Sequence, residues 1–516
     1  MAAPMRSGTG EALDELNSAE ADRRKLQQAF AALDENARLQ AFGFDGWQAW
    51  AIIKPRLWYI ALMRSKGQPP ALPSAGAALS RVLTGFAQLA LNIAAPKPAV
   101  MALLYSERWV RLPEGGSLHP HLGRLADAGS SLRGVSAWSN RKTDQFFLER
   151  GRLSSPAVVG VAAALALFVA RNRKLAALAD ELAAEISPML PMLPRAGLAK
   201  AIAGHLARFR LRRAIWRTLI RRAGAQALAF TDGGSKAAEI AAAKDLALPA
   251  IEIQHGIVST HEPEFAWTSA HRKMLSLPVP DHFVLFGSSW RDALAARGYW
   301  NAADLHLAAP PALAPFRQLA MAKVRTADAP LTILFPTEEF LRGTAIAFWQ
   351  ELLSRAAGQD EVRWRLRIKL HPGERTAAAE YEALVSQFPE RCAFVPSEVE
   401  AFDELAVADV VVGYTSTMLV EAVALGIPTV ALRGGTVPDG FAATFGFPEL
   451  ADAMVETERP ADLLMLLNQA QDDGYHRAWR ARTQASSGRV FSWDAPDVVQ
   501  VVKKLLSGNI VGPTPR

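Results

Sequence analysis

The sequence predicts an α/β protein in which two Rossmann-like domains face each other across a cleft, with a helical region before them. From residue 99 onward, short apolar runs alternate with longer helical patterns, as in parallel sheets covered by helices. A Pro- and Ala-rich stretch at residues 308–315 interrupts this alternation and indicates a linker. The length of 516 residues also exceeds what one hydrophobic core can support.

We therefore expect a helical region at residues 1–98, a first α/β domain at 99–315 and a second at 316–516. Aromatic residues concentrate in the first region, around Trp50 and Trp58. The predicted strands are residues 99–105, 225–230, 250–255, 282–286, 331–336, 365–370, 392–396, 409–412 and 429–432. The predicted helices are residues 156–185, 198–222, 236–244, 344–357, 376–387 and 418–425.

The composition is that of a globular protein, with 50% hydrophobic and 21% charged residues. Cys392 is the only cysteine, which excludes a disulfide framework and fits a reducing compartment. The first residues lack the pattern of a signal peptide. The apolar run at residues 157–170 is shorter than the roughly 20 residues of a membrane span. We expect a cytoplasmic protein.

Residues 410–431 carry the strongest chemical signal, a strand, a polar turn, a helix and a second strand. The turn lies at the carboxyl end of a parallel strand, where open α/β sheets bind ligands. Hydroxyls follow one another there, and the helix start adds free N–H groups, so the turn predicts a seat for phosphate. The alternative is a simple helix cap. The hydroxyl residues are Tyr414, Thr415, Ser416 and Thr417.

Two histidines also follow predicted strands. His371 comes after Lys369 and before Pro372, where an imidazole can hold a phosphate oxygen or be an exposed turn residue. His255 precedes a glycine and can be a general base on an acceptor hydroxyl. Asp232, in the preceding turn, is the rival base or a partner that orients His255.

These motifs resemble the GT-B glycosyltransferases and glycerophosphotransferases of bacterial capsule and surface polysaccharides. The group includes CDP-glycerol glycerophosphotransferases, polysialyltransferases and capsule Kdo transferases. The resemblance covers the C-terminal half and residues 227–256, and leaves the first 200 residues uncovered. It implies a GT-B-like fold.

Within that group, a His-Pro motif and a Ser-containing turn hold the phosphates of a cytidine nucleotide, which corresponds to His371-Pro372 and residues 415–417. The glycerophosphotransferases carry their base in a His-Gly motif, like His255 here. The polysialyltransferases place an acid before glycine, like Asp232. The sequence TDGG lacks the paired acids, and QHGI lacks the residues that follow His-Gly in the glycerophosphotransferases, so both bases stay open.

Weaker signals concern the cleft and a basic helix. Glu421 can bind a ribose or face solvent, and Glu338 and Glu339 can orient the sugar or begin a helix. A helix rich in arginine indicates a patch for a membrane surface or an anionic acceptor, or a solvated face, and nucleic acid is the least favoured ligand. This patch comprises Arg208, Arg212, Arg213 and Trp216 together with Arg210, Arg217, Arg221 and Arg222.

The sequence and the resemblance together predict an inverting glycosyltransferase. It would use a CMP- or CDP-linked donor and act on a glycan or glycolipid acceptor, with a possible position on the inner membrane surface. Because no acid-X-acid pair ends a strand, we expect transfer without a metal or other cofactor. HExxH, Walker A and complete GxGxxG motifs are absent, which disfavours protease, P-loop and dinucleotide functions. The alternatives are a sugar-nucleotide epimerase and a non-catalytic nucleotide-sugar-binding protein.

Overall fold

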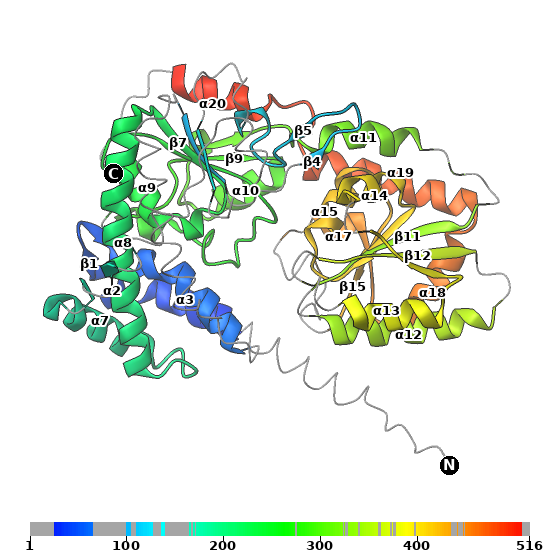
Figure 1. Ribbon diagram of the computed structural model, residues 1–516, viewed down its shortest axis with the longest axis horizontal. Coiled ribbons are helices and arrows are strands. Elements are labelled where there is room, and N and C mark those ends of the chain that lie inside the picture. Colours follow the sequence, from blue (N-terminus) through cyan, green and yellow to red (C-terminus); the bar gives the residue numbers. More distant parts are fainter. Residues whose placement is uncertain are drawn as a thin grey trace, which may run out of the picture.

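The computed structural model describes residues 25–65, 100–104, 110–126 and 136–139 and, with short gaps, residues 162–507. Two six-stranded parallel sheets dominate it, one in each half of the molecule (Figure 1). Helices cover the sheets, and a group of helices extends the first half. The predicted fold class is confirmed: the protein is α/β and GT-B-like, with two Rossmann-like domains.

The first sheet has the strand order β10-β9-β8-β7-β3-β6. Its strands are β3 (Val100–Leu104), β6 (Ser136–Ser139), β7 (Ala227–Phe230), β8 (Ala250–Ile253), β9 (His282–Leu285) and β10 (Leu305–Leu307). The helices α9 (Ala237–Lys244) and α10 (Ser288–Ala296) follow β7 and β9. All residues of β7 and β8 are buried, which explains the apolar run of β7, whereas β8 buries Glu252 among its apolar residues.

The second sheet has the strand order β13-β12-β11-β14-β15-β16. Its strands are β11 (Leu331–Pro336), β12 (Trp364–Lys369), β13 (Cys392–Phe394), β14 (Val410–Gly413), β15 (Thr429–Leu432) and β16 (Met454–Thr457). Its helices are α12 (Arg342–Ala357), α13 (Ala378–Gln387), α14 (Ala401–Val407), α15 (Thr417–Ala424), α17 (Glu449–Ala453), α18 (Pro460–Gln469) and α19 (Asp473–Val490). The chain reverses its winding between β11 and β14, which creates the crevice in which such sheets bind ligands.

The described N-terminal residues do not form a core of their own. They form α2 (Ala37–Ala41), the hairpin β1 (Gly43–Phe44) and β2 (Trp47–Gln48), and α3 (Ala49–Ser65). These elements share one hydrophobic core with α7 (Arg173–Ile186) and the first half of α8 (Arg195–Ala223). The prediction of one continuous helix over residues 156–185 is wrong, because a new helix, α7, starts at Arg173. The Asn172 side chain caps this start by accepting the N–H groups of Lys174 and Leu175.

Two chain segments connect the halves. The first contains α11 (Leu313–Ala322), so the predicted linker at 308–315 already includes the start of a helix. Phe316 of α11 packs against Phe402 with ring centroids 5.4 Å apart. The second segment returns after α19: the Ser492 N–H donates to the Phe286 carbonyl (2.6 Å), and α20 (Val498–Ser507) lies with the first half (Figure 1). The predicted domain boundaries stay predictions. The last part of the predicted second domain, residues 316–516, includes α20, which lies with the first half.

Candidate functional site

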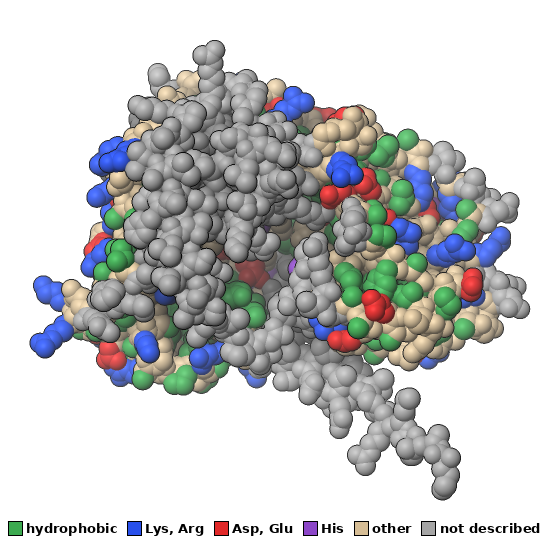
Figure 2. Space-filling view, in the orientation of Figure 1, with side chains coloured by type: hydrophobic (Ala, Val, Ile, Leu, Met, Phe, Trp, Pro, Cys, Tyr) green, Lys and Arg blue, Asp and Glu red, His purple; other side chains and the backbone are tan. Residues whose placement is uncertain are grey.

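A cleft of about 880 Å³ lies at the carboxyl ends of both sheets. The first half contributes His121 and His255 to its walls, and the second half contributes Glu338, His371 and Thr417. Figure 2 shows histidine and acidic side chains in the hollow between the two halves. The sequence placed His255 and His371 at strand ends, and the structure brings both to this one cleft.

The turn after β14 has the predicted backbone form. Ser416 is the N-cap of α15, and its hydroxyl accepts the Met418 N–H at 3.3 Å. A side chain at Gly413 would press on Leu419 at 3.3 Å, so a residue without a Cβ suits the start of this turn. Thr415, Ser416 and Thr417 line the cleft.

The N–H groups of this turn are not open to a ligand in this structure, because the Glu338 carboxylate holds them. Its Oε1 accepts the N–H of Thr415 (2.6 Å) and of Tyr414 (3.2 Å), and its Oε2 accepts the Thr415 hydroxyl. Burial raises the pKa of Glu338, and the hydrogen bonds from Thr415, Ser416 and Tyr414 oppose that rise. In this structure the turn therefore binds a carboxyl group of the protein itself, and the seat for a phosphate stays a prediction.

The predicted hydroxyls differ in where they lie. Tyr414 is 1% exposed and belongs to the core of the second half, so its predicted contact with a donor is wrong. The apolar surroundings that bury the ring also raise the pKa of its hydroxyl. The Thr415 hydroxyl is bound to Glu338, which leaves Ser416 and Thr417 as the hydroxyls nearest the cleft that Glu338 does not bind.

His371 and Lys369 line the cleft at the end of β12. The His371 N–H donates to the Thr337 hydroxyl at 2.8 Å, which fixes the turn while the His371 side chain is exposed. Lys369 Nζ donates to the carbonyls of Pro396 (3.1 Å) and Val399 (2.5 Å). Strand β11 lies between β12 and β14, so Thr337 and Glu338 separate the two predicted phosphate turns. Pro372 and Glu339 lie outside the described residues.

His255 lies at the end of β8 and is held by the turn after β7. Its Nδ1 accepts the backbone N–H of Asp232 at 3.2 Å. Burial lowers the pKa of His255, Asp232 opposes this shift and Lys236 adds to it, so the ring is neutral at pH 7. With Nδ1 as an acceptor, the neutral ring carries its proton on Nε2 and is a hydrogen-bond donor. A general-base role for His255 therefore requires that it release Asp232.

Asp232 supports His255 through its backbone. Its backbone is in the left-handed region, with a φ of 59°. Asp232 is not one of the described residues that line the cleft. Burial raises the pKa of Glu252 and of Glu264, and the charge of the nearby Asp232 carboxylate raises both further. The prediction that Asp232 orients His255 fits this geometry, whereas its role as the rival base does not.

His121 also lines the cleft, although the sequence pattern did not predict it. Its ring lies edge-on to the His255 ring, with centroids 6.3 Å apart, and it lines the same cleft. The preceding His119 is fully buried and accepts the N–H groups of His121 (3.3 Å) and Leu122 (3.0 Å) through Nδ1. The sequence feature that could have indicated this turn is the motif His-Pro-His at residues 119–121, which lies in a segment without a strong strand or helix pattern.

The two halves approach each other closely beside these histidines. A Cβ on Gly256 would lie 3.9 Å from the Thr417 hydroxyl oxygen of the second half. A smaller cavity of about 40 Å³ at this point is lined by His121, His255, Thr417 and Glu421. Glu421 also faces the main cleft, which fits the predicted contact with a ribose better than a solvent-facing position.

The predicted basic patch on α8 is largely neutralised. Trp216 is 3% exposed and lies in a core with β3 and β7, so it is not a membrane anchor. Arg212 pairs with Glu239, and Arg213 pairs with Asp245 at 2.6 Å. Of the three arginines Arg208, Arg212 and Arg213, Arg208 alone has no carboxylate partner among the described residues.

No helix is long and apolar enough to cross a membrane in the part of the chain that the structure describes. Within the same residues, no group of three or more His, Cys, Asp or Glu side chains is arranged to hold a metal ion.

No protein-family model and no curated protein sequence matches this chain. Similar solved structures include the UDP-GlcNAc 2-epimerase from Neisseria meningitidis bound to UDP-GlcNAc, at 10% identity and a TM-score of 0.46, covering 79% of this chain and 99% of that one. The S. aureus MnaA–UDP structure has 9% identity and a TM-score of 0.48, with 79% and 95% covered. The wall teichoic acid polymerase TagF has 10% identity and a TM-score of 0.42, with 84% and 98% covered. At these values the likenesses assign no activity to this chain.

Proposed function

We propose that the protein is a glycosyltransferase that moves a sugar or glycerophosphate from a CMP- or CDP-linked donor to an acceptor. The acceptor would be a bacterial capsule or other surface polysaccharide, or a glycolipid precursor of one. The observation that carries the proposal is the approach of two strand-end turns in one cleft: Gly256, next to His255, lies against Thr417 of the anion-holding turn. A transferase must hold a donor phosphate and an acceptor hydroxyl side by side.

The second half would bind the donor. Ser416 and Thr417 offer hydroxyls beside the helix start, His371 offers an exposed imidazole and Lys369 offers a positive charge. These groups are suited to a phosphate that gains negative charge as the nucleotide leaves. Glu421 would accept a hydroxyl of the ribose.

The first half would bind the acceptor. The acceptor oxygen would attack the donor carbon or phosphorus directly, the bond to the nucleotide would break, and the nucleotide would leave with the electron pair. A direct displacement of this kind inverts the reacting centre. One of the two rings at His255 and His121 would take the acceptor proton, and the other would donate a hydrogen bond to the site. The sequence pattern leads us to propose this transfer without a metal.

Nucleotide binding to the full chain tests the donor half. We expect CMP or CDP to raise Tm more than UDP or GDP. The substitutions His371→Ala and Ser416→Ala should each weaken binding by about 1–3 kcal/mol, because each removes a hydrogen bond to a charged phosphate. His261→Ala is the matched control, since His261 is exposed and outside the cleft. Ser416→Ala also removes a helix cap, so its Tm without ligand must be measured first.

Product analysis separates the transferase from the alternatives. Incubation with a nucleotide sugar and a glycan acceptor should release free nucleotide and lengthen the glycan. Isomerisation of the nucleotide sugar without an acceptor would instead show an epimerase. Equal nucleotide affinity in the wild type, His371→Ala and Ser416→Ala would show that these turns do not bind the donor.

A further inference from the structure

Helix α8 carries four arginines in its middle, and one of them differs from the rest. Arg210 pairs with Asp45 at 2.6 Å, Arg213 pairs with Asp245 at 2.6 Å, and Arg212 pairs with Glu239. Among the described residues, Arg208 has neither an ion pair nor a hydrogen bond, although its side chain is half-buried. A buried or half-buried charge without a partner is costly, so its presence needs a physical explanation.

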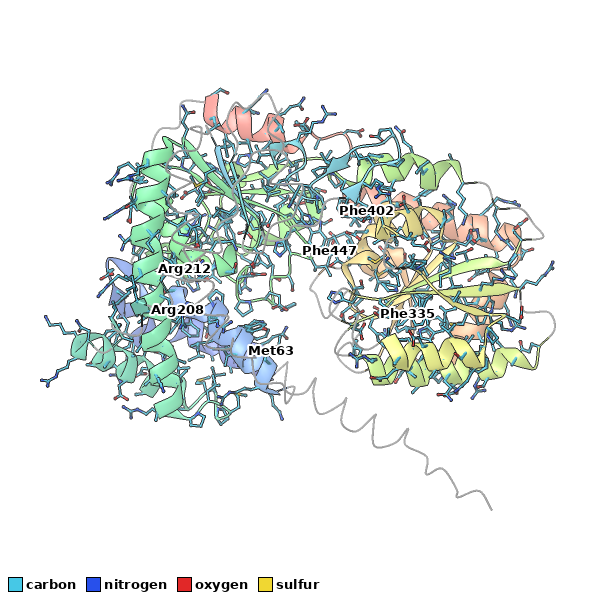
Figure 3. The ribbon with its side chains drawn as sticks, in the orientation of Figure 1. Met63, Arg208, Arg212, Phe335, Phe402 and Phe447 are labelled. Atoms are coloured by element: carbon cyan, nitrogen blue, oxygen red, sulfur yellow. The ribbon has the colours of Figure 1, made fainter. Side chains whose placement is uncertain are left out.

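The neighbours of Arg208 are themselves positive. Its guanidinium lies back along α8, where a Cβ on Gly204 would be 3.6 Å from its Nη1. Helix α3 packs at this level, since His205 Nε2 and the Ile52 carbonyl are 3.1 Å apart. One turn beyond Ile52, α3 carries Arg56, which is exposed. Figure 3 shows Arg208 and Arg212 on the side of α8 that faces α3.

The electrostatics agree with this placement. Burial lowers the pKa of Arg208, and the charges of Arg56 and Arg212 lower it further. Burial and the same three arginines lower the pKa of His205 to about 3, so this histidine is neutral and adds no charge. Arg212 is paired with Glu239 through Nη2, but its buried Nε has no hydrogen-bond partner among the described residues.

We propose that Arg56, Arg208 and Arg212 form a binding site for an oxyanion of the phosphate type. A guanidinium presents planar paired donors that match phosphate oxygens, and three of them around one point would neutralise and hold such a group. An anion there would also offset the positive charges of Arg208 and Arg56, which lie beside the Arg212–Glu239 ion pair. The site is separate from the donor cleft, whose described lining residues include none of these arginines.

The place of the site indicates which molecule carries the anion. Arg212 Nη2 donates to the Ser235 carbonyl at 3.4 Å, and Ser235 ends the turn that holds His255. Helix α3 contacts the same turn. The anion therefore binds on the acceptor side, and we assign it to a phosphate of the acceptor. This assignment rests on the proposed function, whereas the site itself does not.

Thermal unfolding of the full chain with inorganic phosphate and pyrophosphate tests the site, with sodium chloride at equal ionic strength as the reference. For the wild type we expect a rise in Tm of about 1–3 °C at an anion concentration roughly tenfold above the dissociation constant. Arg208→Gln should lose this response and should have a higher Tm than the wild type without the anion, because it removes the repulsion. Arg217→Gln is the matched control, an exposed arginine of the same helix.

A second set of variants keeps the test independent of the donor cleft. His371→Ala should retain the response to phosphate, and Arg56→Gln should reduce it even if Arg208→Gln does not fold. An equal response in Arg208→Gln, Arg56→Gln and the wild type would overturn the proposal, whatever nucleotide the cleft binds. The source of the phosphate follows from two further binding measurements. Loss of binding of Arg208→Gln to vesicles with anionic phospholipid, relative to phosphatidylcholine vesicles, assigns a lipid-linked acceptor, and loss of binding to a soluble phosphorylated glycan assigns a glycan.

Discussion

The turn of residues 231–235 after β7 and the turn of residues 413–417 after β14 both hold a carboxyl group of the protein with backbone N–H groups. In the first half, the Gly233 N–H donates to Glu252 Oε1 at 2.9 Å. In the second half, the N–H groups of Tyr414 and Thr415 donate to Glu338. Each sheet thus presents, at its carboxyl edge, a turn whose N–H groups bind a carboxyl group of the protein itself.

The two carboxylates differ in how firmly they are enclosed. Glu252 is part of strand β8, is 3% exposed and lies where a side chain on Gly233 would collide with it. Burial raises its pKa to about 8, so it is a neutral carboxylic acid at pH 7. Glu338 instead follows the end of β11, is half-buried and lines the cleft. The same backbone arrangement encloses a carboxyl group beneath the turn that holds His255 in one half, and holds a carboxyl group at the cleft in the other.

The largest expected effect separates these two roles. His255→Ala should lower turnover by about 10²–10⁴-fold, because it removes a proton-transfer or hydrogen-bonding group, and should leave nucleotide affinity nearly unchanged. Steady-state transfer assays combined with nucleotide titration measure both quantities, with His261→Ala as the control. Asp232→Asn should keep most of the activity, since its backbone N–H binds His255. Abolished transfer in Asp232→Asn would restore this carboxylate as the base, and full activity in His255→Ala would move the base to His121.

The next prediction tests the protonation state of the buried Glu252 through the pH dependence of the free energy of unfolding. The folded-state pKa of Glu252 is about 8, above its ordinary value of 4.5, so its contribution to stability is full below pH 4.5 and is lost as the pH rises towards 8. Glu252→Gln cannot ionise. We expect it to equal the wild type near pH 4.5 and to be more stable by up to about 4 kcal/mol at pH 9.

Urea unfolding at several pH values measures this difference, and the exposed Glu351→Gln should follow the wild type at every pH. Parallel curves for Glu252→Gln and the wild type would mean that Glu252 is already ionised in the folded protein. In that case the first turn would hold a true anion, and the contrast with Glu338 would disappear.

The residues that the sequence analysis identified well are those whose role depends on local pattern. Strand β14 and helix α15 were predicted almost to the residue, because a run of buried valines meets a polar turn and then a helical pattern. His255 and His371 were placed at the cleft by the same reasoning, since residues after parallel strands gather at one edge of a sheet.

The contacts that the sequence analysis missed join segments that are distant along the chain. Glu338 is 77 residues from Thr415, and only the strand order β12-β11-β14 brings them together. The pairing of Arg213 with Asp245 and the burial of Trp216 likewise depend on how α8 packs on the first half, which helical periodicity alone does not reveal. His121 was missed because its turn contains neither a clear strand nor a helix.

The smallest expected effect tests whether a donor phosphate can replace Glu338 at the N–H groups of the turn of residues 413–417. Glu338→Gln keeps the size of the side chain and an acceptor oxygen, but removes a negative charge next to the predicted phosphate position. We expect nucleotide affinity to rise by about 3–10-fold, because the phosphate no longer competes with a carboxylate for the N–H groups of the turn. Glu252→Gln should leave this affinity unchanged.

Isothermal titration with the preferred nucleotide measures the affinities, and its pH dependence adds a second criterion. The pKa of Glu338 is raised, so protonation as the pH falls should bring the wild-type affinity towards that of Glu338→Gln, and the difference between them should shrink. Weaker binding in Glu338→Gln would instead show that the carboxylate contacts the donor directly, as the sugar-orienting role first predicted for it requires. Both turns would then be internal supports, and the donor phosphate would depend on His371, Ser416 and Thr417 without the N–H groups of the turn.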